Sequence, residues 1–156
     1  MSETTLKDTL HSDLTTAIKA RDELRSATLR MVLTAVKSEE VAGKTAKMLS
    51  DAEVMTVLQR EAKKRAEAAE AFAGAGRAES AEREKAELGV IETYLPAPLS
   101  DEELAELVDE AVLAASAEGL TGMGAMGAVM SQLKPTIGAR ADGKRLSAAV
   151  RARLNN

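Results

Sequence analysis

The chain has 156 residues, of which 45% are hydrophobic, so it can form one ordinary domain or two small ones with a real core. It contains no cysteine, which excludes disulfides, thiolate metal sites and a cysteine nucleophile. Aromatic residues make up 1% and tryptophan is absent, so the core must consist of Ala, Leu, Val, Ile and Met. This composition favours packed helices, because strands draw on aromatic and β-branched residues.

The formal net charge of −4 is unevenly distributed along the chain. Residues 119–156 carry six basic side chains and one acidic side chain, a net charge of +5. The preceding residues carry 15 basic and 24 acidic side chains, a net charge of −9. This polarisation predicts that the C-terminal segment meets an anionic partner.

Apolar residues at helical spacing predict the first two helices. Leu6, Leu10 and Leu14 lie on one face of an amphipathic helix over about residues 4–21. The next segment, LRSATLRMVLTAVKSEEV, is apolar on much of its helical circumference. We therefore expect the second helix to be central.

The next two helices are predicted to form a charged hairpin. Ser50 and Glu53 fit a capping box, so a helix should begin there and end at about Ala73, before the glycines at 74 and 76. Another helix is expected over about residues 78–93.

We interpret the charged faces of this hairpin as solvated surface. In the run EAKKRAEAAE, Glu61 with Arg65 and Lys63 with Glu67 are spaced to form ion pairs on an exposed helix. Glu87 is likewise expected to point outward. No carboxylate pair lies in an apolar setting, so no catalytic acid–base pair is predicted.

Two prolines in the segment YLPAPLS stop helix formation and predict a boundary between a domain over 1–95 and a basic domain over 99–156. Ser100 and Glu103 form a second capping box. We expect a loop around Pro135. The C-terminal helices are predicted over about residues 100–119, 123–133 and 142–154.

No segment shows strand-like alternation, so the predicted fold class is all-α. An N-terminal bundle of about four helices should precede a smaller C-terminal bundle of about three.

A G-x-G-x-x-G pattern at Gly122, Gly124 and Gly127 precedes Asp142 by the spacing of a dinucleotide fingerprint. That fingerprint requires a preceding strand, and the segment before these glycines is predicted to be helical. We interpret the pattern as a coincidence and expect no nucleotide cofactor. Gly127 is expected to allow two helices to approach closely.

Two further motifs are weak. The sequence Gly43-Lys44-Thr45 resembles the end of a phosphate-binding loop, but Ser38 stands where that loop requires glycine. We interpret it as a polar loop. The single histidine, His11, lies on a predicted polar face, so we expect no metal site and no other cofactor.

The basic C-terminal segment carries the strongest functional signal. Lys144 and Arg151 share a face of the last predicted helix, and nucleic-acid phosphates would suit this face. A solubilising face is the alternative, because no aromatic residue is present there for base stacking. The candidate RNA-binding residues are Lys134, Arg140, Lys144, Arg145, Arg151 and Arg153.

Two blocks of the sequence resemble a known family. The block AFAGAGRAESAEREKAELGVIETYLPAPLSDEEL resembles the YqeY proteins, which share its "aGR" turn and "YLP" motif. The block GAVMSQLKPTIGARADGKRLSAAVRARL is similar both to YqeY and to the tail domain of GatB, a subunit of the tRNA-dependent amidotransferase. The matching positions are Gly76, Arg77, Tyr94, Leu95, Pro96, Gly127, Val129, Met130, Gly138, Asp142 and Gly143.

The resemblance implies an all-helical protein of two bundles, with a C-terminal domain like the one that holds the outer body of tRNA in the amidotransferase. The chain has no room for the kinase-like and amidase portions of that enzyme. We therefore expect a non-catalytic tRNA-binding or tRNA-associated helper.

Two other functions stay open. The charged hairpin over 51–93 suits a protein-interaction module that acts on a translation-related partner. The resemblance also implies an accessory role in carbon–nitrogen ligase chemistry with glutamine as the amide donor. No segment approaches the roughly 20 apolar residues of a membrane span, so we expect a cytoplasmic protein.

Overall fold

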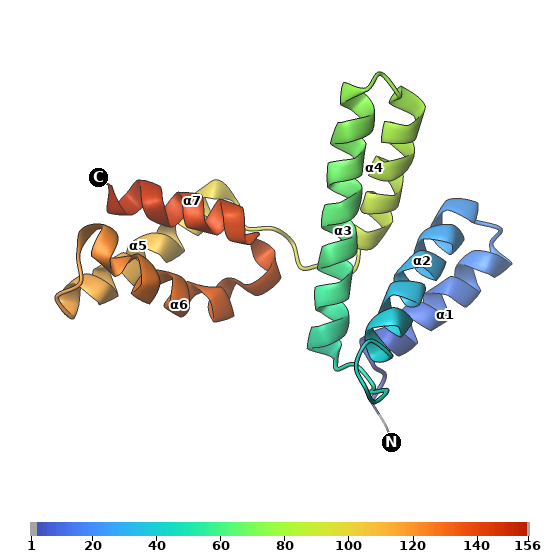
Figure 1. Ribbon diagram of the computed structural model, residues 1–156, viewed down its shortest axis with the longest axis horizontal. Coiled ribbons are helices and arrows are strands. Elements are labelled where there is room, and N and C mark those ends of the chain that lie inside the picture. Colours follow the sequence, from blue (N-terminus) through green and yellow to red (C-terminus); the bar gives the residue numbers. More distant parts are fainter. Residues whose placement is uncertain (1–2, 156) are drawn as a thin grey trace. The chain divides into compact units, whose positions relative to one another are not determined.

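The computed structural model describes residues 3–155, and these residues form α-helices, two short 3-10 helices and connecting turns, without a strand. The chain divides into two compact units, Met1–Leu95 and Pro96–Asn156. Four α-helices belong to the first unit and three to the second (Figure 1). The predicted all-α fold class is confirmed.

In the first unit, α3 packs along α4 as a hairpin, and α2 contacts each of the other three helices (Figure 1). The central position expected for the second helix is therefore observed. The bounds of the helices are Leu6–Lys19 for α1, Glu23–Glu40 for α2, Asp51–Gly74 for α3 and Ala78–Glu92 for α4.

A capping box starts the hairpin, and a turn that contains a glycine joins its two helices. The Ser50 hydroxyl accepts a hydrogen bond from the Glu53 amide at 3.2 Å, and the Glu53 carboxylate accepts from the Ser50 amide at 3.1 Å, which confirms the predicted capping box. After α3, Gly76 has a φ of 75°, a conformation that glycine adopts without strain. The Arg77 amide then donates to the Phe72 carbonyl at 2.8 Å, which closes the turn.

The core of the first unit is aliphatic, as the composition predicts. Leu10, Leu29 and Leu58, from three different helices, are at most 1% exposed. Val32 and Ile91 join them, so all four helices contribute to one cluster. Burial of each such side chain stabilises the fold by about 1.5–3 kcal/mol.

In the second unit, α5 packs against both α6 and α7, which also contact one another. Leu104 and Val108 from α5, Val129 and Leu133 from α6, and Val150 from α7 form its core. The elements are α5 Asp101–Ala117, the 3-10 helix η1 Gly122–Ala125, α6 Met126–Ile137, the 3-10 helix η2 Gly138–Arg140 and α7 Gly143–Leu154.

Two expectations for this unit are wrong. Pro135 lies inside α6 and not in a loop, because the helix continues to Ile137. Proline in a helix interior costs about 3 kcal/mol, but Leu133 and Ile137 on either side of it are buried, and their burial offsets this cost. Gly127 does not mediate a close helix approach, because it is exposed and a Cβ atom there would meet no other atom within 4 Å.

No single helix within residues 3–155 combines the length and the apolar character that crossing a membrane requires. The segments Asp101–Ala117 and Gly122–Ile137 reach that length and composition only as a pair, with a bend of 99° between them.

Candidate functional site

The C-terminal helix α7 presents two cations on one face. Its N-cap, Asp142, accepts a hydrogen bond from the Arg145 amide at 2.7 Å, and its buried side chains, including Leu146 and Val150, point into the core of the second unit. Lys144 and Arg151 are exposed. Because they are seven residues apart on a helix, they lie on the same outward face.

The other three candidate arginines have acidic partners within the second unit. All of these partners lie in α5. The acidic residues in the first turn of this helix interact favourably with the positive end of the helix dipole. The pairs are Arg140 with Glu103, Arg145 with Asp101 and Arg153 with Asp109, with nitrogen–oxygen distances of 3.8, 2.7 and 2.6 Å.

These acidic partners of the arginines are largely exposed. The side chain of Asp101 is 97% exposed and that of Asp109 is 52% exposed. The pKa of Glu103 is lowered, chiefly by the hydrogen bond from the Ser100 backbone, then by the Ser100 hydroxyl, and further by the charge of Arg140. The lowered pKa keeps the Glu103 carboxylate charged at neutral pH.

Three of the six candidate cations remain without an acidic partner among the described residues. Lys134, Lys144 and Arg151 are all exposed, and no ion pair within residues 3–155 includes them. The structure thus divides the candidate residues into paired and unpaired cations, a distinction that the sequence did not reveal.

The expected basic character holds only for part of the second unit. Residues 96–156 carry six basic and eight acidic side chains, a net charge of −2. Seven of those acidic residues precede residue 119, and none of the basic ones does. The opposite charges of the second unit are therefore separated, with an acidic α5 packed against a basic α7.

Several residues of the family motif in the second unit have structural roles. Gly138 ends α6 with a φ of 54°, a conformation suited to glycine, and Gly143 is the first residue of α7. Val129 is fully buried and Met130 packs against the same core. The Arg140 carbonyl accepts from the Leu99 amide at 2.8 Å, which fixes the entry to α5.

The "YLP" motif ends the first unit. The Tyr94 hydroxyl donates to the Asp13 carboxylate at 2.5 Å and accepts from the Arg25 guanidinium at 2.9 Å. Burial, and then the hydrogen bond to Asp13, raise the pKa of Tyr94 to about 12. Leu95 packs against the core, and Pro96 starts the second unit. The motif thus ties the end of α4 to α1 and α2.

Arg77 belongs to the turn of the other family motif. Its guanidinium carbon lies 5.0 Å from the centre of the Phe72 ring, a cation–π contact across the tip of the hairpin. This contact and the positive φ of Gly76 explain the "aGR" turn.

The glycine-rich pattern does not have the geometry of a dinucleotide site. Gly122 and Gly124 lie in η1 and Gly127 lies in α6, and the element before them is the helix α5. Asp142 caps α7. His11 is exposed on α1, and residues 3–155 contain no group of three His, Asp or Glu side chains that could hold a metal ion.

The hairpin contains a buried charge network that the sequence analysis missed. Glu61, Arg65 and Glu87, predicted to be solvated, are only 7%, 6% and 7% exposed. Their helices explain this burial: Glu61 and Arg65 continue the buried stripe of Val54 and Leu58 along α3. The sequence signal for this burial is the spacing of Glu61 and Arg65 from Val54 and Leu58, which places both charged residues on the core-facing side of the helix.

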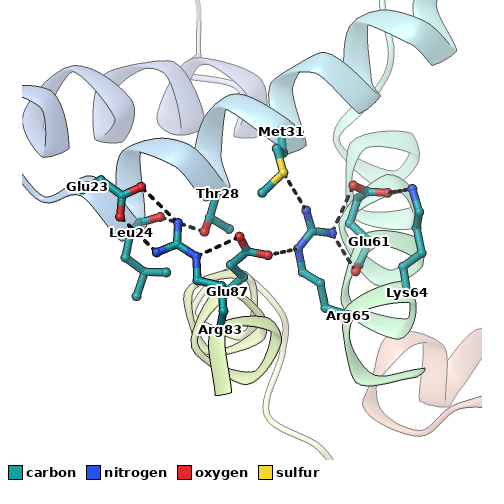
Figure 2. Close-up of polar contacts among 9 residues, drawn as sticks. All are labelled: Glu23, Leu24, Thr28, Met31, Glu61, Lys64, Arg65, Arg83 and Glu87. Atoms are coloured by element: carbon teal, nitrogen blue, oxygen red, sulfur yellow. Dashed lines mark hydrogen bonds and ion pairs between the residues drawn. The ribbon is translucent and has the colours of Figure 1, made fainter. Parts of the chain in front are cut away.

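The buried residues belong to a row of six alternating charges, here called the charge ladder (Figure 2). Arg65 Nη1 lies 3.2 Å from the Glu61 carboxylate, and Arg65 Nε lies 3.5 Å from the Glu87 carboxylate. The predicted pair of Lys63 with Glu67 is absent among the ion pairs of the described residues. In order, the ladder consists of Glu23, Arg83, Glu87, Arg65, Glu61 and Lys64.

Comparison with known proteins assigns the chain to a family. No curated protein matches the sequence significantly. The sequence profile of a family described as "Yqey-like protein" matches residues 7–154, which include nearly all of both units. The chain therefore belongs to the YqeY-like protein family.

Proposed function

We propose that the protein is a non-catalytic RNA-binding helper whose second unit binds the phosphates of tRNA. The observation that carries this proposal is the exposed face of α7, where Lys144 and Arg151 stand without an acidic partner among the described residues. Each phosphate that such a cation neutralises releases counterions, which supplies sequence-independent affinity. Lys134 on α6 is a third contact of the same kind.

The acidic α5 limits how many arginines take part. Asp101 and Asp109 occupy the guanidinium groups of Arg145 and Arg153. Their exposed carboxylates also repel phosphates at close range. RNA must therefore compete with α5 for two of the cations, and we expect Lys134, Lys144 and Arg151 to make the phosphate contacts in the unmodified protein.

The composition of the second unit favours a structured RNA as the ligand. The only aromatic residues of the chain, Phe72 and Tyr94, precede residue 96, so the second unit has no ring for base stacking. Recognition should then depend on backbone phosphates and helical shape. The similarity to the amidotransferase tail domain supports the body of tRNA over other double-helical RNA.

Binding of the full-length protein to a fluorescently labelled tRNA transcript, measured by anisotropy against salt concentration, tests this proposal. Three phosphate contacts predict a log–log slope of about 2 to 3. A single-stranded RNA of equal length should bind more weakly. Binding that is absent at low salt, or that does not change with salt, would contradict the proposal.

A further inference from the structure

A groove of about 600 Å³ lies within the first unit, between α2, α3 and α4. Met31, Ala35 and Ala68 give it an apolar floor, and Arg65 lines it beside them. Met31 is 39% exposed. The groove thus combines solvent-accessible apolar surface with a buried guanidinium.

Arg65 has more hydrogen-bond donors than acceptors around it. Nη1 donates to the Glu61 carboxylate at 3.2 Å and to the Glu61 carbonyl at 3.0 Å. Nη2 reaches only the sulfur of Met31, at 3.6 Å, which is a weak acceptor (Figure 2). Nε is buried and has no hydrogen-bond partner within residues 3–155, although Glu87 lies 3.5 Å away. A ligand oxygen that replaces the Met31 sulfur at Nη2 would reduce this deficit.

The charge of the groove argues against an anionic ligand. Its lining contains three cations and three carboxylates, so it is neutral overall. Glu61 and Glu87, which flank Arg65, would repel a phosphate or a carboxylate. An uncharged acceptor such as a peptide carbonyl avoids this repulsion. The charged lining residues are Arg30, Lys64, Arg65, Glu61, Glu84 and Glu87.

We infer that this groove binds an uncharged, aliphatic peptide segment of a partner protein. A main-chain carbonyl of the segment accepts from the Arg65 guanidinium in place of the Met31 sulfur, and an aliphatic side chain packs on Ala35 and Ala68. Met31 is suited to such an exchange, because its unbranched side chain adapts easily to a new neighbour. This site is independent of the RNA-binding proposal, because its residues belong to the first unit.

The test uses the full-length protein and N-acetyl-leucine N-methylamide, a small molecule with two peptide carbonyls and one aliphatic side chain. Nuclear magnetic resonance follows the Arg65 Nε–H signal, assigned by its loss in Arg65→Lys, and the methyl group of Met31. Both signals should shift and saturate. The methyl group of Met48, which is 82% exposed and outside the groove, should not shift.

Matched variants separate groove binding from surface adsorption. Ala68→Leu fills the groove without altering any charge, and it should abolish the saturable shifts. Ala71→Leu changes an exposed position on the same helix outside the groove, and it should preserve them. Saturable shifts that persist in Ala68→Leu, or no saturable shift of Arg65 in the unmodified protein, would overturn the inference.

Acetate and inorganic phosphate serve as anionic probes of the same groove. Both should leave the Arg65 signal unchanged at concentrations at which the capped leucine saturates it. Saturable binding of either anion, tighter than that of the capped leucine, would show an anion site and would also overturn the inference.

Discussion

The first unit contains a group of buried ion pairs, whereas the ion pairs between α5 and the arginines of the second unit lie at the surface. In the first unit, Glu61, Arg65 and Glu87 are at most 7% exposed, so their charges hold α3 and α4 together out of water. In the second unit, the pairs between α5 and α7 include acids such as Asp101, whose side chain is 97% exposed. Buried pairs cannot exchange partners without a large desolvation cost, whereas exposed pairs exchange readily. The buried guanidinium of Arg65 is therefore not available to an external anion, whereas the exposed cations of α7 are.

The largest expected effect of this contrast is on stability. Arg65→Met leaves the buried carboxylates of Glu61 and Glu87 with only the more exposed Lys64 and Arg83 as partners, and we expect a loss of up to about 3–5 kcal/mol in the free energy of unfolding. Arg153→Met breaks an exposed pair and should cost less than about 1 kcal/mol. Urea unfolding followed by circular dichroism measures both.

A triple variant checks that the loss comes from uncompensated charge. Replacing Glu61, Arg65 and Glu87 together by methionine removes all three buried charges, so much of the lost stability should return. Equal destabilisation by Arg65→Met and Arg153→Met would remove the distinction between the buried and the exposed ion pairs.

The second effect is on RNA affinity. Lys144→Gln with Arg151→Gln removes two phosphate contacts, which should weaken tRNA binding by about 10- to 50-fold at roughly 0.1 M salt. Lys44→Gln with Lys63→Gln removes the same charge from exposed positions of the first unit and serves as the control. A gel shift with labelled tRNA measures the difference, and an equal loss in both variants would indicate only a general charge effect.

A smaller effect, an increase in tRNA affinity, is expected when the acidic residues of α5 no longer compete with RNA for the arginines. Asp101→Asn with Asp109→Asn releases Arg145 and Arg153 and removes two charges that repel phosphate. The affinity for tRNA should rise by about 3- to 10-fold at low salt. If affinity falls or stays constant, α5 does not compete with RNA for these arginines.

The smallest expected effect is a change in the pKa of Tyr94. Tyr94 is the only tyrosine and tryptophan is absent, so ultraviolet absorbance reports the ionisation of Tyr94 directly. Its midpoint should lie near pH 12, and Asp13→Asn should lower it toward 10.0 because a negative acceptor is lost. Since folding raises this pKa, its contribution to stability is complete below pH 10 and is lost as the pH rises through 12. An unchanged midpoint in Asp13→Asn would rule out this coupling.

Local signals explain why much of the fold could be predicted from the sequence. The capping boxes at Ser50 and Ser100 lie within four residues, and they start α3 and α5 as expected. The position of Pro135 shows the limit of such signals, because the burial of Ile137 in the core overrides a local helix breaker.

The candidate site was harder to predict from the sequence, because pairing between residues far apart in the chain decides which cations are free. Arg145 and Asp101 are 44 residues apart, so neither the partner nor the resulting division into paired and unpaired cations can be read from spacing. The burial of Glu87 beside Arg65 likewise depends on how α4 packs along α3. From the sequence alone, a carboxylate in a highly charged helix is predicted to be exposed, and only the packing of the neighbouring helix shows that it is buried.

The most direct test of the account compares two double variants of equal charge in tRNA binding. Lys144→Gln with Arg151→Gln removes unpaired cations, and Arg145→Gln with Arg153→Gln removes paired ones. We expect the log–log salt slope to fall by about 1.4 to 1.8 in the first variant and to change little in the second. Equal slopes in the two variants, or a larger fall in the second, would contradict this expectation.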